Sequence, residues 1–166
     1  KSLNDLKAVI EKIMKRVLNV SHVEFFMPTD DPTCFQSRWD HTFKLSEAVI
    51  NWTIRHQPVI NQNMVNMNPM YAPYKSELQH IFNQNRCHFL VPIVQNQRLL
   101  ACIGLSAKNQ DQTLSPNENE FLKGIARASG IAFSNSLMFQ NISNLKDTLE
   151  RQTFELHQEI KDRKKA

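Results

Sequence analysis

The sequence predicts an α+β domain built on a central antiparallel sheet of five or six strands, followed by a long C-terminal helix. Three observations lead to this prediction. Apolar residues recur at helical spacing over residues 2–19. Two apolar runs of strand length, residues 87–94 and 99–105, are separated by four polar residues, which is typical of a hairpin. After Pro116 no further proline occurs before Ala166, which allows a helix about 75 Å long.

Short strands and helices are predicted between the first helix and residue 60. Residues 22–27 form a strand that Pro28 stops, and residues 33–39 and 41–45 are weaker strand candidates. A helix follows from Ser46 and ends before Pro58. The apolar pair Val59 and Ile60 then suits a short edge strand.

The middle of the chain has a less regular pattern. Residues 61–73 are rich in asparagine and contain Pro69 and Pro73, so we expect a loop. A helical pattern resumes over residues 74–85, and the closing hairpin follows. This order of elements is typical of an α+β domain with an antiparallel sheet.

The last helix has three start signals. Ser115 can cap the helix, Pro116 suits the first helical position, and Glu118 can reach back to complete a capping box. A helix of this length exceeds the width of a small domain, so we expect another domain at its far end. The chain is therefore interpreted as a sensor or relay module of a larger protein.

The composition excludes several classes of function. Hydrophobic residues make up 41% of the chain, yet none of the apolar runs reaches membrane-spanning length and no signal peptide opens the chain. We expect a cytoplasmic segment without membrane contact. The net charge of +4 comes from basic side chains that are mixed with acidic ones around the first and last predicted helices. Because they form no basic stripe on one face, nucleic-acid binding is not indicated. Cys34, Cys87 and Cys102 are widely spaced and predict free, mostly buried thiols rather than a metal site.

The second half of the sequence resembles the closing half of a GAF domain. Residues 99–108 end in Gly-hydrophobe and a lysine, and residues 114–122 supply a leucine, a capping serine and acidic residues. Residues 131–139 are similar to the usual exit of that domain, and residues 56–60 to the start of its middle strand. The resemblance covers about residues 3–139. It implies first and last helices together on one face of the sheet, and a small-molecule pocket with short helices and loops on the other.

The motifs by which GAF domains bind two known ligands, cyclic nucleotides and bilins, match this sequence only in part. Of the cyclic-nucleotide motif Asn-Lys…Phe-x-x-x-Asp-Glu, only Lys108 matches outright, so an ion pair between Lys108 and Glu118 is the better interpretation. The dipeptide Cys87-His88 resembles the bilin attachment site of phytochrome-type domains. Alternation along the predicted strand places Cys87 on the same face as Phe89, Val91 and Ile93, which favours a buried structural thiol.

The sequence gives little support for catalysis or for metal binding. Free methionine sulfoxide reductases use three cysteines on a GAF scaffold, but in a histidine- and glycine-rich loop, and residues 61–86 contain neither glycine nor cysteine. The six histidines form no i, i+4 pair with histidine or cysteine, so haem or metal sensing is not indicated. Met64, Met67 and Met70 suit an apolar lid better than copper ligation. The module itself is not predicted to be an enzyme, and no cofactor is identified.

The implied pocket is apolar, with an unidentified small-molecule ligand. Its predicted lining combines the segment after residue 61, the next helix and two opposite strands, with two polar residues at the edge: Trp39, Phe43, Met67, Met70, Tyr71, Tyr74, Leu78, Phe82, Arg86 and His88. An ordinary second core without a ligand explains the same residues equally well.

The last helix carries a heptad seam beyond the domain. Alternating steps of four and three join Met138, Ile142, Leu145, Leu149, Gln152 and Leu156. This spacing predicts a parallel two-stranded coiled coil over residues 138–166. The first helix is expected to join the dimer interface through Leu6, Ile10, Ile13 and Val17.

These features predict a homodimeric, cytoplasmic GAF sensor over residues 1–137. Its signal would pass through residues 138–166 to an output domain in the same chain, such as a sensor histidine kinase of a two-component system, a cyclase or a diguanylate cyclase. The alternative is a dimerisation and spacer module that binds no ligand.

Overall fold

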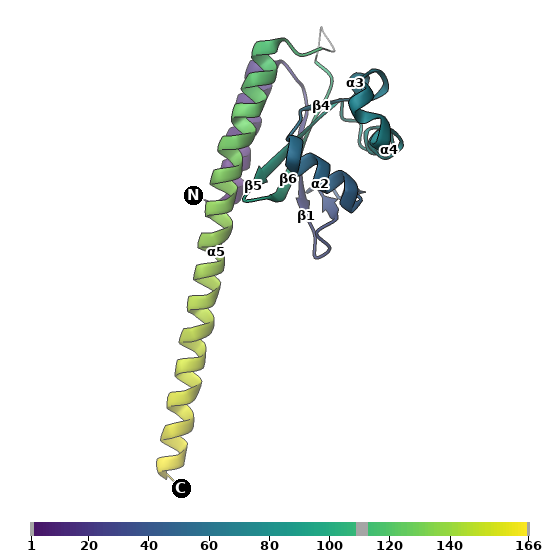
Figure 1. The fold of residues 1–166 in the computed structure, drawn as a ribbon. Helices are drawn as coiled ribbons and strands as arrows, with labels where there is room; N and C mark the ends of the chain where they lie inside the picture. Colours follow the sequence, from purple (N-terminus) through teal and green to yellow (C-terminus); the bar gives the residue numbers. More distant parts are fainter. Residues whose placement is uncertain (1, 109–112, 166) are drawn as a thin grey trace.

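The domain is a six-stranded antiparallel sheet with helices on both faces and one helix that runs far past it (Figure 1). The computed structural model describes residues 2–108 and 113–165. Part of the polar gap that the sequence shows between residues 108 and 114 lies outside this range, as does the last residue, Ala166. The elements in chain order are α1 (Leu3–Leu18), β1 (Val23–Pro28), β2 (Cys34–Gln36), β3 (Thr42–Lys44), α2 (Glu47–His56), β4 (Ile60–Asn61), α3 (Gln62–Met67), the 3₁₀ helix η1 (Pro69–Tyr74), α4 (Lys75–Asn85), β5 (Phe89–Gln95), β6 (Arg98–Leu105) and α5 (Pro116–Lys165).

The strands lie in the order β3-β2-β1-β6-β5-β4. The predicted hairpin is confirmed as β5 and β6, whose turn residues Asn96 and Gln97 have φ values of 54° and 60°. Positive φ at both central residues is what a type I′ hairpin turn requires. The predicted edge strand is β4, which pairs with β5 through Ile60 and Asn61.

Two hydrophobic clusters lie on opposite faces of the sheet. On one face, α1 and α5 lie side by side (Figure 1) and bury Met14 and Phe133 against strand residues such as Phe89 and Ile103. On the other face, α2, α3, η1 and α4 cover Phe26 and Leu90. This arrangement confirms the α+β architecture expected from the sequence.

The start of α5 has the predicted capping box. The Glu118 amide donates to Ser115 Oγ at 3.1 Å, and the Ser115 amide donates to Glu118 Oε1 at 3.0 Å. Lys108 Nζ also lies 2.8 Å from Glu118 Oε1, which confirms the predicted ion pair. Hydrogen bonds from Lys108 and from the Ser115 amide hold the pKa of Glu118 below its usual value. These contacts join the end of the sheet to the start of the last helix.

The loop predicted for residues 61–73 is wrong, because this segment forms α3 and η1. The side chain of Asn61 accepts from the amide of Asn63 at 3.0 Å, and Asn68 accepts from the amide of Met70 at 3.0 Å. Asparagines that look like loop residues are therefore the caps of two short helices. Burial of Val65 and Tyr71 then stabilises both helices against the sheet.

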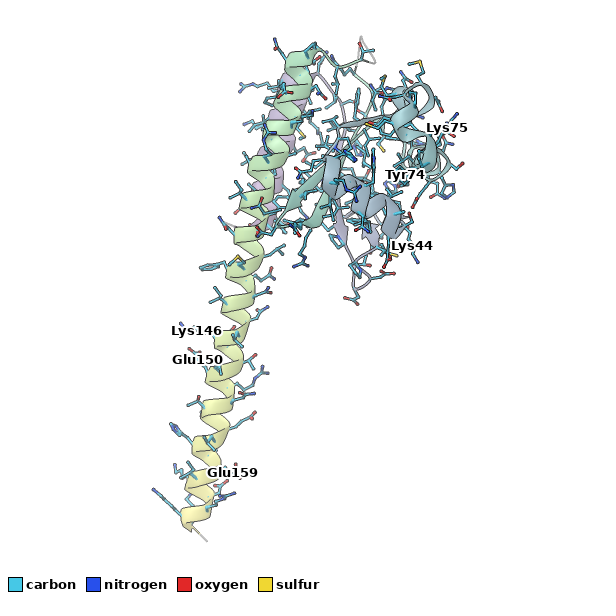
Figure 2. All side chains as sticks on the ribbon, viewed as in Figure 1. Lys44, Tyr74, Lys75, Lys146, Glu150 and Glu159 are labelled. Atoms are coloured by element: carbon cyan, nitrogen blue, oxygen red, sulfur yellow. The ribbon has the colours of Figure 1, made fainter. Side chains whose placement is uncertain are left out.

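The second half of α5 leaves the domain. The helix is continuous for 50 residues, and from Met138 to Lys165 all residues except the half-buried Thr148 are exposed. This part extends about 42 Å at 1.5 Å per residue. In Figure 2 the side chains of Lys146, Glu150 and Glu159 project from it with no other element beside them. Neither α5 nor any other helix within the described residues has the length and apolar character needed to cross a membrane.

Candidate functional site

Four of the predicted pocket residues pack together on the face of the sheet away from α1 and α5. Phe43, Tyr71, Leu78 and Phe82 are buried in one cluster, and Tyr74 packs against it. The ring centroid of Trp52 lies 5.5 Å from that of Tyr71 and 5.2 Å from that of Tyr74. Sequence reasoning placed Trp52 only in a helix, although its spacing from Val49 puts both on one helical face. In this structure these aromatic side chains fill the space against one another.

Three other predicted pocket residues lie outside this cluster. Met67 is 70% exposed and Met70 43% exposed, because α3 and η1 turn Val65 and Tyr71 toward the sheet instead. Trp39 is 41% exposed and belongs to the turn between β2 and β3 rather than to a strand. The prediction of an aromatic wall that includes Trp39 is therefore wrong.

A polar cavity of about 430 Å³ opens at one end of the same face. It lies between β1, the turn after β2 and the C-terminal end of α4, and its lining residues are His22, Glu24, His41, Gln84, Asn85, Arg86 and Ser106. Arg86, predicted at the pocket edge, is the α4 C-cap in a left-handed conformation with φ of 52°. His88 is not among the lining residues; it is half-buried, with its ring 4.8 Å from that of Phe89.

Glu24 is the central group of this cavity. Its side chain is almost fully buried, with the residue only 2% exposed. His22 Nε2 lies 3.1 Å from Glu24 Oε1, and His41 Nδ1 lies 2.6 Å from Glu24 Oε2. Because an ionised carboxylate only accepts hydrogen bonds, each histidine carries a proton on the nitrogen that faces Glu24.

Burial alone would raise the pKa of Glu24. Hydrogen bonds from Ser37, His22 and His41, together with the charge of His41, outweigh this effect and hold the pKa below its usual value. A buried carboxylate is tolerated only when it is paired in this way. The cavity therefore presents an ionised acid between two histidines, with Arg86 on its rim.

Sequence reasoning missed Glu24, His22 and His41. One signal was available, since Glu24 is the only charged residue in the apolar strand 22–27. Alternation along β1 places it on the same face as the buried Phe26. A carboxylate at a core-facing position of a strand is rarely found without partners.

Two of the three cysteines, Cys87 and Cys102, are buried, and Cys34 is half-buried. Cys87 precedes β5 and packs with Leu90, whereas Phe89, Val91 and Ile93 face the opposite cluster. The predicted shared face is therefore wrong, because the regular strand begins only at Phe89, after the left-handed Arg86. Burial of the thiol is nevertheless observed: it raises the pKa of Cys87 to about 12, and it raises that of Cys102 as well. Within the described residues no three histidine, cysteine, aspartate or glutamate side chains are placed to hold a metal ion.

Solved structures show which fold this is. The chain is similar to a far-red cyanobacteriochrome photoreceptor, with TM-score 0.59 and 15% identity over 81% of this chain and 87% of that one. It is also similar to a GAF domain/HD domain protein from Geobacter sulfurreducens (TM-score 0.57, 9% identity, 84% and 97% covered). A third similar structure is the GAF domain of a phosphoenolpyruvate-protein phosphotransferase from Coxiella burnetii, with TM-score 0.58 and 12% identity over 84% of this chain and 87% of that one. The chain has the GAF fold.

These solved structures confirm the GAF resemblance that the sequence predicts. None of the protein-family models matches the sequence, and none of the curated proteins is significantly similar to it.

Proposed function

We propose that this chain is a ligand-sensing GAF module of a cytoplasmic signalling protein. Two copies pair in parallel through α5, which carries the signal to an output domain in the same chain. The three similar structures support this role, since one is a photoreceptor and another joins a GAF domain to an HD domain. The three free cysteines fit a reducing compartment. With Cys87 and Cys102 too buried to act as nucleophiles, binding is favoured over catalysis in the module itself.

The continuity of α5 carries the proposal. Leu122, Ser129 and Phe133 are buried against the domain, and the same helix continues without a break to Lys165. A helix that is fixed to the sheet at one end transmits any displacement of the sheet to its other end. The seam residues Met138, Ile142, Leu145, Leu149 and Leu156 are 54–62% exposed in the single chain.

Pairing removes this apolar surface from water. Burying one leucine side chain stabilises the dimer by about 2 kcal/mol, and each seam position contributes one side chain from each of the two helices. The contribution of α1 differs from that expected from the sequence. Ile10 is buried in the domain's own core and Leu6 packs against it, whereas Val9 and Val17 are half-exposed. We propose that Val9, Ile13 and Val17 are the α1 residues that reach the partner.

The dimer is tested by replacing Leu145 and Leu149 with aspartate and measuring mass in solution by light scattering. We expect a wild-type dimer at micromolar concentration and a monomeric double variant. The matched control replaces Gln140 and Asn144 with aspartate, two exposed positions on the opposite side of the same helix. If the wild type is monomeric, or if both variants dissociate equally, the seam residues do not form the dimer interface.

Ligand sensing is assigned to the Glu24 cavity. This assignment is tested by thermal-shift measurements with cyclic nucleotides, nucleobases, amino acids and haem. A ligand that binds only the folded state, at a hundredfold its Kd, raises the free energy of unfolding by about 2.7 kcal/mol. A shift that disappears in Glu24→Gln and Arg86→Gln supports the assignment. The packed aromatic cluster favours the alternative of a ligand-free spacer, which predicts a dimer but no shift with any of these compounds.

A further inference from the structure

A second cavity lies on the opposite face of the sheet from Glu24. It has a volume of about 540 Å³ and opens between α1 and the part of the sheet formed by β1 and β2. The lining residues that matter here are Lys7, Glu11, Phe25, Met27, Arg38 and Trp39. Cavities of this size accommodate small organic ligands.

Two cations converge on this cavity. Lys7 comes from α1 and Arg38 from the turn after β2, and the ion pairs formed within residues 2–108 and 113–165 include neither. Glu11, an acid on the same wall, has its carboxylate 3.2 Å from Lys15. Burial, and to a lesser extent the nearby Arg38, lowers the pKa of Lys7. A bound anion would offset the repulsion between these two cations.

Apolar and aromatic side chains form one part of the remaining wall, and polar residues form the other part: Asn4, Thr29, Asp30, Gln36 and Ser37. Phe25 and Met27 are half-buried, and they present side chains on the face of β1 that α1 covers only in part. The guanidinium carbon of Arg38 lies 4.3 Å above the centre of the Trp39 ring, which fixes the cation beside an aromatic surface. Ser37 is already used, because its hydroxyl accepts from the amides of Trp39 and His41.

We propose that this cavity binds a small organic anion with a flat aromatic body. The anionic group lies between Lys7 and Arg38, and the aromatic body packs on Phe25 and Met27, beside the Trp39 ring that Arg38 covers. Apolar walls with a few convergent polar groups are the usual form of such sites. Two bases, Lys7 and Arg38, and two acids, Glu11 and Asp30, line this cavity; Glu11 is paired with Lys15, and Asp30 lies in the turn after β1.

The site stays open in the proposed dimer. The α1 residues that line the cavity are Asn4, Lys7, Ala8 and Glu11. At about 100° per residue they lie roughly 170° around the helix from Val9, Ile13 and Val17, the proposed contact residues. Failure of the dimer would therefore leave this proposal standing, and failure of this proposal would leave the dimer standing.

The test uses naphthalene-2-carboxylate as the probe and titration calorimetry as the readout. We expect saturable binding with a Kd of about 1 mM or tighter, which a ligand of this size reaches at ordinary efficiency. Lys7→Met and Arg38→Gln should each weaken binding at least tenfold. The neutral analogue 2-naphthylmethanol should bind more weakly to the wild type and equally to all variants.

Two matched controls locate the site. Lys12→Met removes an exposed α1 lysine outside the cavity, and Arg86→Gln removes the arginine of the Glu24 cavity. Both should retain wild-type affinity for the probe. Absence of saturable binding, an equal loss in Lys12→Met, or a loss confined to Arg86→Gln would overturn the proposal. Circular dichroism of each variant establishes that it is folded, and Lys7→Gln replaces Lys7→Met if the latter is not.

Discussion

Adding one methyl group at Gly130 tests how closely α5 lies on the sheet. A Cβ atom at Gly130 would lie 2.8 Å from the carbonyl oxygen of Val94 in β5, a backbone atom that cannot rotate away. At Gly124, six residues earlier in the same helix, a Cβ atom would meet no heavy atom within 4 Å. The same substitution, glycine to alanine, therefore has opposite structural consequences at two positions of α5.

The expected magnitudes follow from these contacts. In a helix interior alanine is about 1 kcal/mol more favourable than glycine, so Gly124→Ala should stabilise the protein by about that amount. Gly130→Ala gains the same helix propensity but forces α5 away from β5, and overpacking of this kind costs about 1–3 kcal/mol. The propensity term cancels between the two variants. Their unfolding free energies should therefore differ by about 1–3 kcal/mol, with Gly130→Ala the less stable.

Urea unfolding measures this difference. Both substitutions are made in the Leu145→Asp, Leu149→Asp background, so that dissociation of a dimer does not contribute to stability. The midpoints should differ while the m values stay equal. If Gly130→Ala proves as stable as Gly124→Ala, the close approach of α5 to Val94 is wrong, and the proposed mechanical link between sheet and helix loses its support.

Two further predictions concern acid stability and thiol reactivity. The pKa of Glu24 is lower in the folded state than in the unfolded chain, so its contribution to stability is complete above pH 4.5 and is lost as pH falls through the folded-state pKa; urea titrations at falling pH should show this loss in the wild type and a smaller one in Glu24→Gln. Ellman's reagent should modify the half-buried Cys34 in the native protein, whereas Cys87 and Cys102 should react only on unfolding, and rapid native labelling of all three would contradict their burial.

Local signals were enough to predict the elements whose residues interact with close neighbours in the chain. The α5 capping box joins residues three apart, and the β5–β6 hairpin joins runs separated by a short turn. The helical spacing over residues 2–19 likewise predicted α1. In each case the pattern and the partner lie within one stretch of sequence.

The functional groups could not be predicted in this way because their partners are distant in sequence. Glu24 is held by His41, 17 residues later, and it faces a cavity completed by Arg86 from the end of α4. The Lys7–Arg38 cavity likewise joins the first helix to the turn after β2. Arg86 was expected at the edge of the apolar pocket, and it lines the Glu24 cavity instead. The error at Cys87 arose at the β5–β6 hairpin, since alternation was extended two residues beyond the point where regular pairing begins.

The turn that carries Trp39 connects the two cavities. β2 and β3, which this turn joins, pair along all three of their residues, whereas β2 pairs with β1 through only two residue pairs. Ser37 and His41, at the two ends of the turn, are also hydrogen-bonded to the buried Glu24. Between them, Arg38 and Trp39 line the cavity beside α1, and the centre of the Trp39 ring also lies 5.1 Å from that of His22, which lines the Glu24 cavity. Glu24 therefore holds both ends of the turn whose Trp39 ring lines the second cavity.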